Sequence, residues 1–432
     1  PNTTFTKLSN VYCSMNSALA VAIGLTIAII LILKKCHPVY ALILGAVVSG
    51  LMSGWGFALT IKEMFSGVRD ISPAIVRILA AGVLTGVLVK TGAADKIALT
   101  IVEKAGRRNV FLALALSVFI LTGVGVFIDV AVITVAPIAI MIGKEMGLSK
   151  GKVLLALIGG GKCGNIVSPN PNTIIAAENY DAPLSSVMAA GIVPALVGMA
   201  ALIFIILPML PDKGFSDMKN AEGTDCSKTD LPSFMASITG PLVAVLLMVL
   251  RPVFGISIDP AIALPAGGLA GVLATRKWKS TLESMSYGLE KMSPIAVLLV
   301  GTGTIAGVIK ASAVKDLLIS LIAGWDGGAA LIAPVSSILM SAASASTTAG
   351  ATIASASFAQ TVLAAGVNAV WAAAMTNAGA TVLDHLPHGS FFHATGGSIG
   401  MDLKERLRLI PYESLIGLVL VSMTAVMMLI MV

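Results

Sequence analysis

Long apolar runs separated by short polar segments extend along most of the chain. Four of these runs, 17–33, 38–53, 233–250 and 414–432, contain no Asp, Glu, Lys or Arg. Each has close to the roughly 20 residues that a helix needs to cross the hydrocarbon core of a bilayer. The pattern predicts an all-α polytopic membrane protein and excludes a soluble fold.

The pattern also repeats once along the chain. Residues 67–95 align without a gap with residues 288–316, and Pro171 corresponds to Pro387 farther along. The identical pairs in the first alignment include Gly67 with Gly288, Ser72 with Ser293, Pro73 with Pro294, Gly82 with Gly303, Gly86 with Gly307 and Asp95 with Asp316. Internal repeats of this kind are common in transporters and indicate that one structural unit was used twice.

Each repeat predicts the same order of elements: three spans, a re-entrant hairpin, an interrupted helix and a final span. In the first repeat, 1–211, these are expected at 17–34, 38–54, 74–90, 110–143 (hairpin), 152–180 (interrupted helix) and 187–209. In the second repeat, 233–432, they are expected at 233–250, 259–275, 293–310, 328–365 (hairpin), 369–397 (interrupted helix) and 411–431. The polar segment 212–232 is predicted to be a cytoplasmic linker.

The basic residues predict how the repeats are oriented. If each hairpin returns to its own side, a repeat has five membrane spans plus one re-entrant hairpin, and the odd number of crossings inverts the second repeat. With this topology 20 of the 28 Lys and Arg residues lie on one face and six on the other, while Arg77 and Lys162 lie within spans. Cytoplasmic loops are rich in Lys and Arg, so the first face is predicted to be cytoplasmic and both termini to face outward. Orientation therefore explains the net charge of +6, and nucleic acid is not expected as a partner.

Two segments cannot form regular helices at membrane depth. Residues 159–173 (GGGKCGNIVSPNPNT) and 377–397 (NAGATVLDHLPHGSFFHATGG) combine Gly and Pro with polar side chains. Irregular backbone is tolerated inside a bilayer only where protein or a cavity satisfies its polar groups, and transporters use such breaks to bind substrates. The two segments are therefore predicted to meet at mid-membrane and to form one polar pocket. The alternative for the first segment is a packing kink whose small residues allow close helix contact.

The substrate-binding candidates come from these two segments and from the tip of the second hairpin. They are Lys162, Asn165, Ser168, Asn170, Asn172, Thr173, Ser346, Thr347, Thr348, His385 and His388. Lys162 is a candidate carboxylate receptor with Asp129 as its possible partner, unless its side chain extends to a membrane interface. Arg77 is expected either to extend its side chain to a membrane interface or to pair with Asp70. Helix N-termini at both hairpin tips would suit an anionic ligand.

The proton-coupling candidates are Asp129, Asp384 and His393. A lone acid among apolar residues, as Asp129 is in VFIDVAVI, is costly unless it pairs, takes up a proton or is satisfied by backbone amides. The histidines His385, His388 and His393 could carry protons, donate hydrogen bonds to a substrate or cap free carbonyl groups. Their spacing matches no zinc motif, so no metal site is predicted.

Three runs of sequence resemble known transporters. The runs GKCGNIVSPNPNTI, DHLPHGSFFHATGG and LKERLRLIPYESLIGL resemble permeases of the gluconate permease (GntP) family, within the ion transporter superfamily. The resemblance implies symport of sugar acids or related small organic anions with protons across a bacterial inner membrane. It also implies a homodimer and an elevator-type movement of a transport domain past a scaffold domain. The DHLPHGSFFH run differs from the gluconate branch of the family, so the substrate could be another hydroxycarboxylate.

The sequence thus predicts a proton-coupled symporter that imports a small organic anion, with no catalytic residue, cofactor or bound metal. Three other functions remain open. A sodium-coupled carboxylate transporter would bind Na⁺ at the hydroxyl-rich tips and free carbonyl groups, and a cation/proton antiporter would bind its ion at the acids. A membrane metalloenzyme would hold zinc tightly at the histidines.

Overall fold

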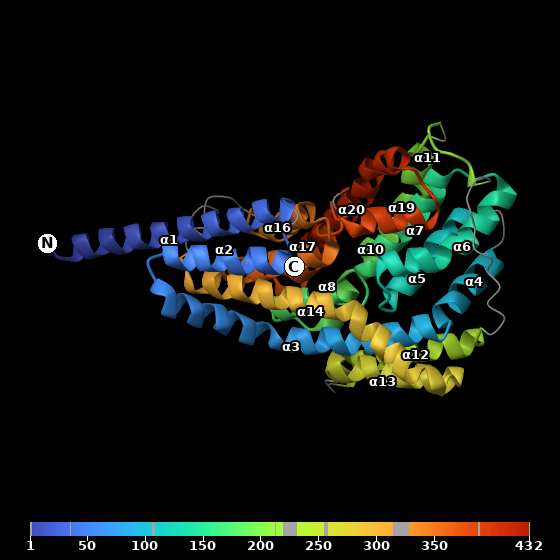
Figure 1. Cartoon of the computed structure of the whole chain (residues 1–432), viewed down its shortest axis with the longest axis horizontal. Coiled ribbons are helices and arrows are strands. Elements are labelled where there is room, and N and C mark those ends of the chain that lie inside the picture. Colours follow the sequence, from blue (N-terminus) through green and yellow to red (C-terminus); the bar gives the residue numbers. More distant parts are fainter. Residues whose placement is uncertain are drawn as a thin grey trace.

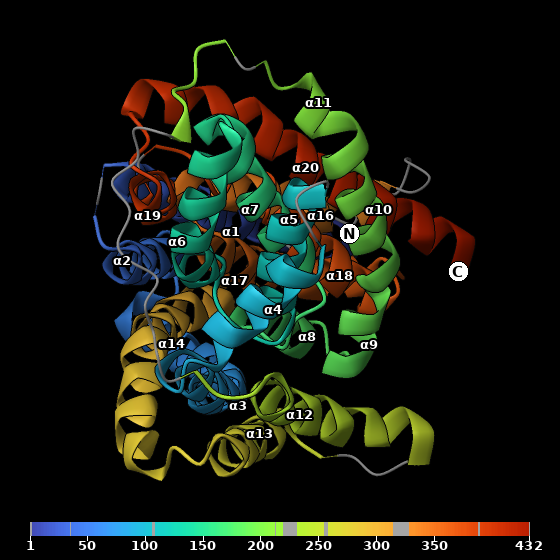
Figure 2. The ribbon, with the colours of Figure 1, turned by 90° about the vertical axis from the view of Figure 1, so that its right-hand side faces the viewer.

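A computed structural model describes residues 2–34, 36–105, 109–211, 213–218, 231–254, 258–313, 328–387 and 389–431. These residues are nearly all helical, as the sequence predicts. The helices α1 (Asn2–Leu33), α2 (Pro38–Met52), α3 (Gly56–Lys90) and α14 (Thr281–Ala311) run side by side along the long axis of the molecule (Figure 1). Viewed along that axis, α12 (Phe234–Phe254) and α13 (Pro260–Thr275) lie on the side of α3 away from α20 (Leu403–Met431) (Figure 2).

The remaining helices build a second group. From the first half of the chain it contains α4 (Ala93–Ala105), α5 (Val110–Gly123), α6 (Ile128–Met146), α7 (Lys150–Asn165), α8 (Pro171–Asn179), α9 (Leu184–Ala190), α10 (Ile192–Ala201) and α11 (Leu207–Met209). From the second half it contains α16 (Gly328–Ser344), α17 (Thr347–Ala364), α18 (Ala369–Gly379), α19 (Ser390–Ser398) and α20. The chain reverses between α5 and α6 and between α16 and α17, and helical structure is broken between α7 and α8 and between α18 and α19.

Among the residues that the structure describes, four helical segments are long and apolar enough to cross a membrane: Gly56–Lys90, Leu184–Met209, Trp278–Ala311 and Leu403–Met431. Two of them begin well before the predicted spans at 74–90 and 293–310. The helices extend through charged residues such as Arg69, Asp70 and Glu290, whose side chains lie on exposed faces. At about 1.5 Å per residue, the 35 residues of α3 exceed the thickness of a hydrocarbon core.

Glycines allow α3 and α14 to pack in direct backbone contact. A Cβ added at Gly67 would lie 2.0 Å from the carbonyl oxygen of Gly303, and one added at Gly288 would lie 2.0 Å from that of Gly82. At the end of the contact, a Cβ on Gly86 would lie 1.9 Å from the carbonyl oxygen of Ser284. Residue numbers rise along one helix as they fall along the other, so the two helices are antiparallel. Gly67 faces Gly303 and Gly288 faces Gly82, and the repeat alignment converts one of these contacts into the other.

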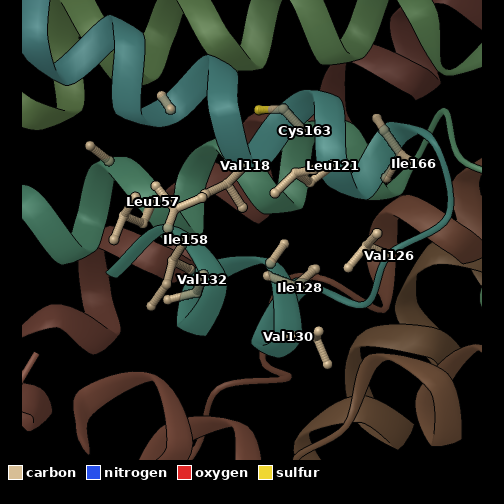
Figure 3. Packing of buried hydrophobic residues seen from close by; sticks show 14 of the residues in the cluster. Val118, Leu121, Val126, Ile128, Val130, Val132, Leu157, Ile158, Cys163 and Ile166 are labelled. Carbon is tan, nitrogen blue, oxygen red and sulfur yellow. The ribbon is translucent and has the colours of Figure 1, made fainter. Parts of the chain in front are cut away.

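The largest core packs the first hairpin against α7. Figure 3 shows its interlocked side chains, among them Val118 of α5, Val132 of α6 and Leu157 of α7. Two glycines of the 159–173 segment bring the backbones together: a Cβ at Gly160 or Gly164 would lie 2.0 or 2.2 Å from the carbonyl oxygen of Ala115 or Phe119, respectively. Close helix packing, raised as an alternative for this segment, is thus part of its structure, upstream of the break itself.

Candidate functional site

The two helix breaks meet through a buried ion pair. Lys162, near the end of α7, donates a hydrogen bond of 2.6 Å to Oδ1 of Asp384, which lies between α18 and α19. The lysine also donates to the carbonyl oxygen of Thr381. Lys162 is 0% exposed, so its side chain does not extend to an interface, and its partner is Asp384, not Asp129 as the sequence suggested. The pairing matters because a buried charge is tolerated only when it is paired and hydrogen-bonded.

The tip of the second hairpin completes the bonding of Asp384. Thr347 is the first residue of α17, and its hydroxyl donates a hydrogen bond of 2.6 Å to Oδ2 of Asp384. Both carboxylate oxygens are therefore occupied, one by α7 and one by the hairpin tip. Three segments far apart in sequence are held together at this one side chain.

Local sequence explains why α7 ends where it does. Asn170 caps α8: its Oδ1 accepts a bond of 3.0 Å from the backbone N–H of Thr173, and its Nδ2 donates one of 2.7 Å to the carbonyl oxygen of Asn165. Pro171 occupies the first turn of α8, where the missing N–H costs nothing. The Asn-Pro pair therefore ends one helix and begins the next without leaving the backbone unsatisfied.

A cavity of about 430 Å³ lies beside the ion pair. It is bounded by both hairpin tips, both breaks, and helices α2 and α14. The predicted site residues that line it are Asn165, Asn172, Ser346, Thr347, Thr348, Asp129 and Asp384. Within the part of the chain that the structure describes, Nδ2 of Asn165 and Oδ1 of Asn172 are buried without a hydrogen-bond partner. Such atoms are rare in folded proteins, and here they are available to a ligand.

Three predicted substrate residues lie inside the first break and do not line the cavity. Asn170 and Thr173 bond to each other, and the hydroxyl of Thr173 accepts a bond of 3.0 Å from Nδ2 of Asn377 in α18. The side chain of Ser168 is fully buried. These residues shape the break and connect it to α18.

Asp129 and the histidines occupy different environments. Asp129 is half-buried in the first turn of α6, where Oδ1 accepts a bond of 2.9 Å from the N–H of Val130. His385 is fully buried behind Asp384 and does not line the cavity, whereas His393 is exposed and its Nε2 lies 2.8 Å from the carbonyl oxygen of Pro387. His388 lies outside the described residues. Among those described, no group of three or more His, Cys, Asp or Glu side chains could hold a metal ion.

A second buried ion pair was missed by the sequence reasoning. Arg406 and Glu413 of α20 are both buried and are joined through both carboxylate oxygens, and Oε2 of Glu413 lies 3.9 Å from Nδ1 of His385. Two signals could have found the pair. Residues seven apart share one face of a helix, and an acid inside a predicted span, here 411–431, is a functional candidate by default.

A third ionic group lies between the two groups of helices. Arg77 of α3 donates to both carboxylate oxygens of Asp259, at 3.1 and 2.7 Å, and pairs with Glu178 of α8. The alternative partner from the sequence, Asp70, instead accepts a bond of 2.8 Å from Lys310. Arg77, Glu178 and Asp259 line a second cavity of about 440 Å³.

Comparisons with known proteins place the chain among transporters. The sequence model of a family described as GntP family permease matches residues 17–266, and the sequence model of a Na⁺-H⁺ antiporter family matches residues 235–325. The chain is 50% identical over 404 residues to a Haemophilus influenzae protein named "Uncharacterized transporter", covering 94% of this chain and 96% of that protein.

More distant relatives carry names that include a substrate. The chain is 25% identical over 406 residues to a gluconate permease of Pseudomonas aeruginosa, covering 87% of this chain and 88% of that one. It is 23% identical over 368 residues to the D-serine transporter DsdX of Escherichia coli, covering 77% and 81%. The fold is similar to the crystal structure of the Alcanivorax borkumensis YdaH transporter, with a TM-score of 0.59, 14% sequence identity, and coverage of 84% and 86% of the two chains.

Proposed function

The chain belongs to the GntP permease family, and on that premise we propose that it imports a small organic anion together with protons. It is a multi-pass membrane transporter, and its relatives are named transporters or permeases, not enzymes. The observation that carries the proposal is the polar cavity beside the Lys162–Asp384 pair, which both hairpin tips and both helix breaks enclose. We place the protein in a bacterial inner membrane, because the relatives named above come from bacteria and the Lys and Arg residues predict one cytoplasmic face.

The substrate class follows from the groups that face the cavity. The relatives are named for gluconate and D-serine, and both molecules combine a carboxylate with at least one hydroxyl group. Helices α6 and α17 begin at the cavity, and the partial positive charge of a helix N-terminus attracts a carboxylate. The first turn of α6 already holds the carboxylate of Asp129, so the N-terminus of α17 is the proposed site for the substrate carboxylate. The unpartnered amide atoms of Asn165 and Asn172 and the hydroxyl groups of Ser346 and Thr348 would bind substrate hydroxyls.

Coupling to protons follows from the acids at the site. Asp129 lines the cavity, and an ionised Asp129 would repel an anion in the same low-dielectric space. A proton on Asp129 removes this repulsion, so proton and anion favour each other's binding. Asp384 is left out of the proposal as a carrier, because Lys162 and Thr347 hold its two carboxylate oxygens and a proton there would leave the buried lysine without its anion. His393 is left out of the proposal, because it is exposed and its ring caps the carbonyl group of Pro387.

For the movement we propose an elevator in which α1–α3 and α12–α14 form the scaffold and the hairpins and interrupted helices move. The antiparallel contact of α3 with α14, which joins repeat-related glycines, supports two inverted repeats. The site residues themselves lie almost entirely on the second group of helices, so they could move as one unit. The scaffold would also provide the homodimer contact.

Uptake into proteoliposomes tests the proposal. With the interior alkaline, labelled D-gluconate or D-serine should accumulate, and a protonophore should abolish accumulation. Asp129→Asn should keep substrate exchange across equal concentrations but lose accumulation, because only net transport requires the proton. Uptake that ignores the pH gradient and depends on sodium would refute proton coupling.

Exchange of sodium for protons is the second candidate function, because residues 235–325 match a Na⁺-H⁺ antiporter family. That match covers α12 to α14 but neither hairpin tip nor either helix break. Antiport predicts that sodium added to proteoliposomes collapses a pH gradient without any organic acid present. Symport predicts that the gradient collapses only when the organic acid is added.

A further inference from the structure

Oε2 of Glu413 lies 3.9 Å from Nδ1 of His385, and neither of these residues lines the cavity. We infer that Glu413, held by Arg406, is a positioning residue that stabilises His385 in its protonated form while a proton passes the buried cluster. The inference rests on the proposed proton coupling and extends it to α20, which carries none of the residues predicted from sequence.

The hydrogen bonds of His385 leave room for two protonation states. Nε2 lies 3.0 Å from the carbonyl oxygen of Ile410 and 3.1 Å from Oγ of Ser414. We assign a hydrogen to Nε2, because the carbonyl oxygen can only accept and the hydroxyl can accept as well. Nδ1 lies 3.0 Å from Nζ of Lys162, 3.0 Å from Oδ1 of Asp384 and 3.9 Å from Oε2 of Glu413. In the neutral ring Nδ1 accepts from Lys162, and in the protonated ring an Nδ1–H is directed at carboxylate oxygens. The ring therefore has a partner in either state.

The surrounding charges make Glu413 necessary for the protonated state. The charged groups near the ring are Lys162 from α7, Asp384 from the second break, and Arg406 with Glu413 from α20. Helices α10 and α18, which also pack against α20, carry no charged residue. Two cations and two anions sum to zero, so a proton on His385 gives the cluster one net positive charge. An anion in the cavity would balance that charge, which links the proton to the substrate.

A purely structural role for the pair makes a different prediction. Arg406 also donates to the carbonyl oxygen of Phe392 at 3.2 Å and to the hydroxyl of Thr395 at 3.3 Å, and so it fastens α20 to α19. If Glu413 served only to neutralise this arginine, replacing both by apolar residues would preserve transport. If Glu413 acts on His385, that replacement preserves the fold but not proton-driven uptake.

The experiment compares three variants in proteoliposomes with labelled D-gluconate and D-serine as probes. Glu413→Gln should lose proton-driven uptake at least about tenfold and keep substrate exchange within about twofold. Its pH for half-maximal uptake should move at least about one unit lower, because a negative charge near Nδ1 is lost. Glu413→Asp keeps the charge and should keep most of the wild-type pH profile.

The double variant Arg406→Met/Glu413→Leu removes both charges and so leaves no unpaired buried ion, which protects the test if the single variant misfolds. It should fold and exchange substrate but fail to accumulate it. Asp70→Asn, which removes an exposed acid on α3, is the control and should behave like the wild type. A wild-type pH profile in Glu413→Gln, or wild-type accumulation in the double variant, overturns the inference alone. Wild-type uptake that is indifferent to the pH gradient overturns proton coupling and this inference together.

Discussion

Two ionic groups in this molecule share a composition but differ in burial. Each has one basic side chain bonded to acidic groups from another part of the chain: Lys162 with Asp384 at the helix breaks, and Arg77 with Glu178 and Asp259 beside the second cavity. The first pair is 0% and 2% exposed, whereas the side chains of the second are 25%, 22% and 42% exposed. The first lies within the group of helices that carries the site, and the second connects that group to α3 and α13.

The difference in burial indicates what each group can do. Separating Lys162 from Asp384 would leave two charges in a medium that cannot solvate them, so these segments have to stay together. Separating Arg77 from Glu178 would return both to a water-accessible cavity at modest cost. We therefore expect the buried Lys162–Asp384 pair to persist during transport and the exposed ion pairs of Arg77 to break in the proposed movement of the site.

The largest effect should come from removing Lys162. Lys162→Met leaves Asp384 buried without its cation and should destabilise the protein by about 3–5 kcal/mol, with loss of all transport. Lys162→Met/Asp384→Leu removes both charges and should recover most of the stability but no transport. Thermal unfolding in detergent and substrate exchange measure the two quantities. If the double variant were as unstable as the single one, the unpaired buried charge of Asp384 would not be the cause of the instability.

A smaller loss should follow from Thr347→Val, which keeps the shape but removes the donor to Oδ2 of Asp384. An unsatisfied carboxylate oxygen costs about 1–3 kcal/mol, and the hairpin tip would lose its tie to the second break. Thermal unfolding should show the lower stability, and the Michaelis constant for uptake should rise. Thr348→Val, at the neighbouring position, is the matched control and should leave the unfolding temperature near that of the wild type.

The helix breaks could be predicted from sequence because they depend on local chemistry. Gly, Pro and Asn in 159–173 and the Pro and ionisable residues of 377–397 disfavour a continuous helix at membrane depth. Both breaks are shorter than predicted, because α7 continues through its glycines to Asn165, α8 begins at Pro171 and α19 already covers Ser390–Ser398. Long apolar runs predict helices for the same local reason. The starts of α3 and α14 were predicted too late, at 74 and 293 instead of Gly56 and Thr281, while the predicted ends at 90 and 310 agree with the structure to within one residue. A charged residue need not end a helix, because the face of the helix that it occupies depends on tertiary packing.

The pairing of charges could not be predicted, because sequence gives no distances between helices. Asp129 was the partner predicted for Lys162, and the structure gives Asp384 instead. Asp70, on the same helix, was the predicted partner of Arg77, but Arg77 bonds to Asp259, which is 182 residues away in the sequence. Glu413 stands near the predicted start of a span beside Pro411, where an acid can equally be at the membrane surface. Its contact with His385 depends on how α20 packs.

Arg77→Gln should have a small effect on stability and a clear effect on conformation. Stability should change by about 1 kcal/mol or less, since exposed ion pairs contribute little. Glu178 and Asp259 would then face each other without a shared cation, so the second cavity should open more often. A cysteine introduced at Ser185, which lines that cavity, should react severalfold faster with a water-soluble maleimide.

The control for this experiment is Lys310→Gln. Lys310 and Asp70 are also exposed, but their ion pair joins α14 to α3, both in the proposed scaffold, and does not cross to the helices that we propose to move. Labelling at position 185 should stay at the wild-type rate in this variant. Faster labelling in both variants would show that any lost surface charge loosens the protein, and Arg77 would then have no special part in closing the cavity.

The smallest effect should come from salt, which weakens the exposed ion pairs of Arg77 but not the buried Lys162–Asp384 pair. At 1 M ionic strength the screening length is about 3 Å, so water-accessible charges interact weakly, while buried pairs are screened much less. Labelling at position 185 should rise by less than about twofold in wild type and stay unchanged in Arg77→Gln, which has already lost the interaction. Thermal unfolding should show that the cost of Lys162→Met is the same in low and high salt, because solvent ions do not reach that side chain. If the cost of Lys162→Met depended on salt, water would have to reach the Lys162–Asp384 pair. The proposed difference, in which this pair persists while the ion pairs of Arg77 break, would then no longer hold.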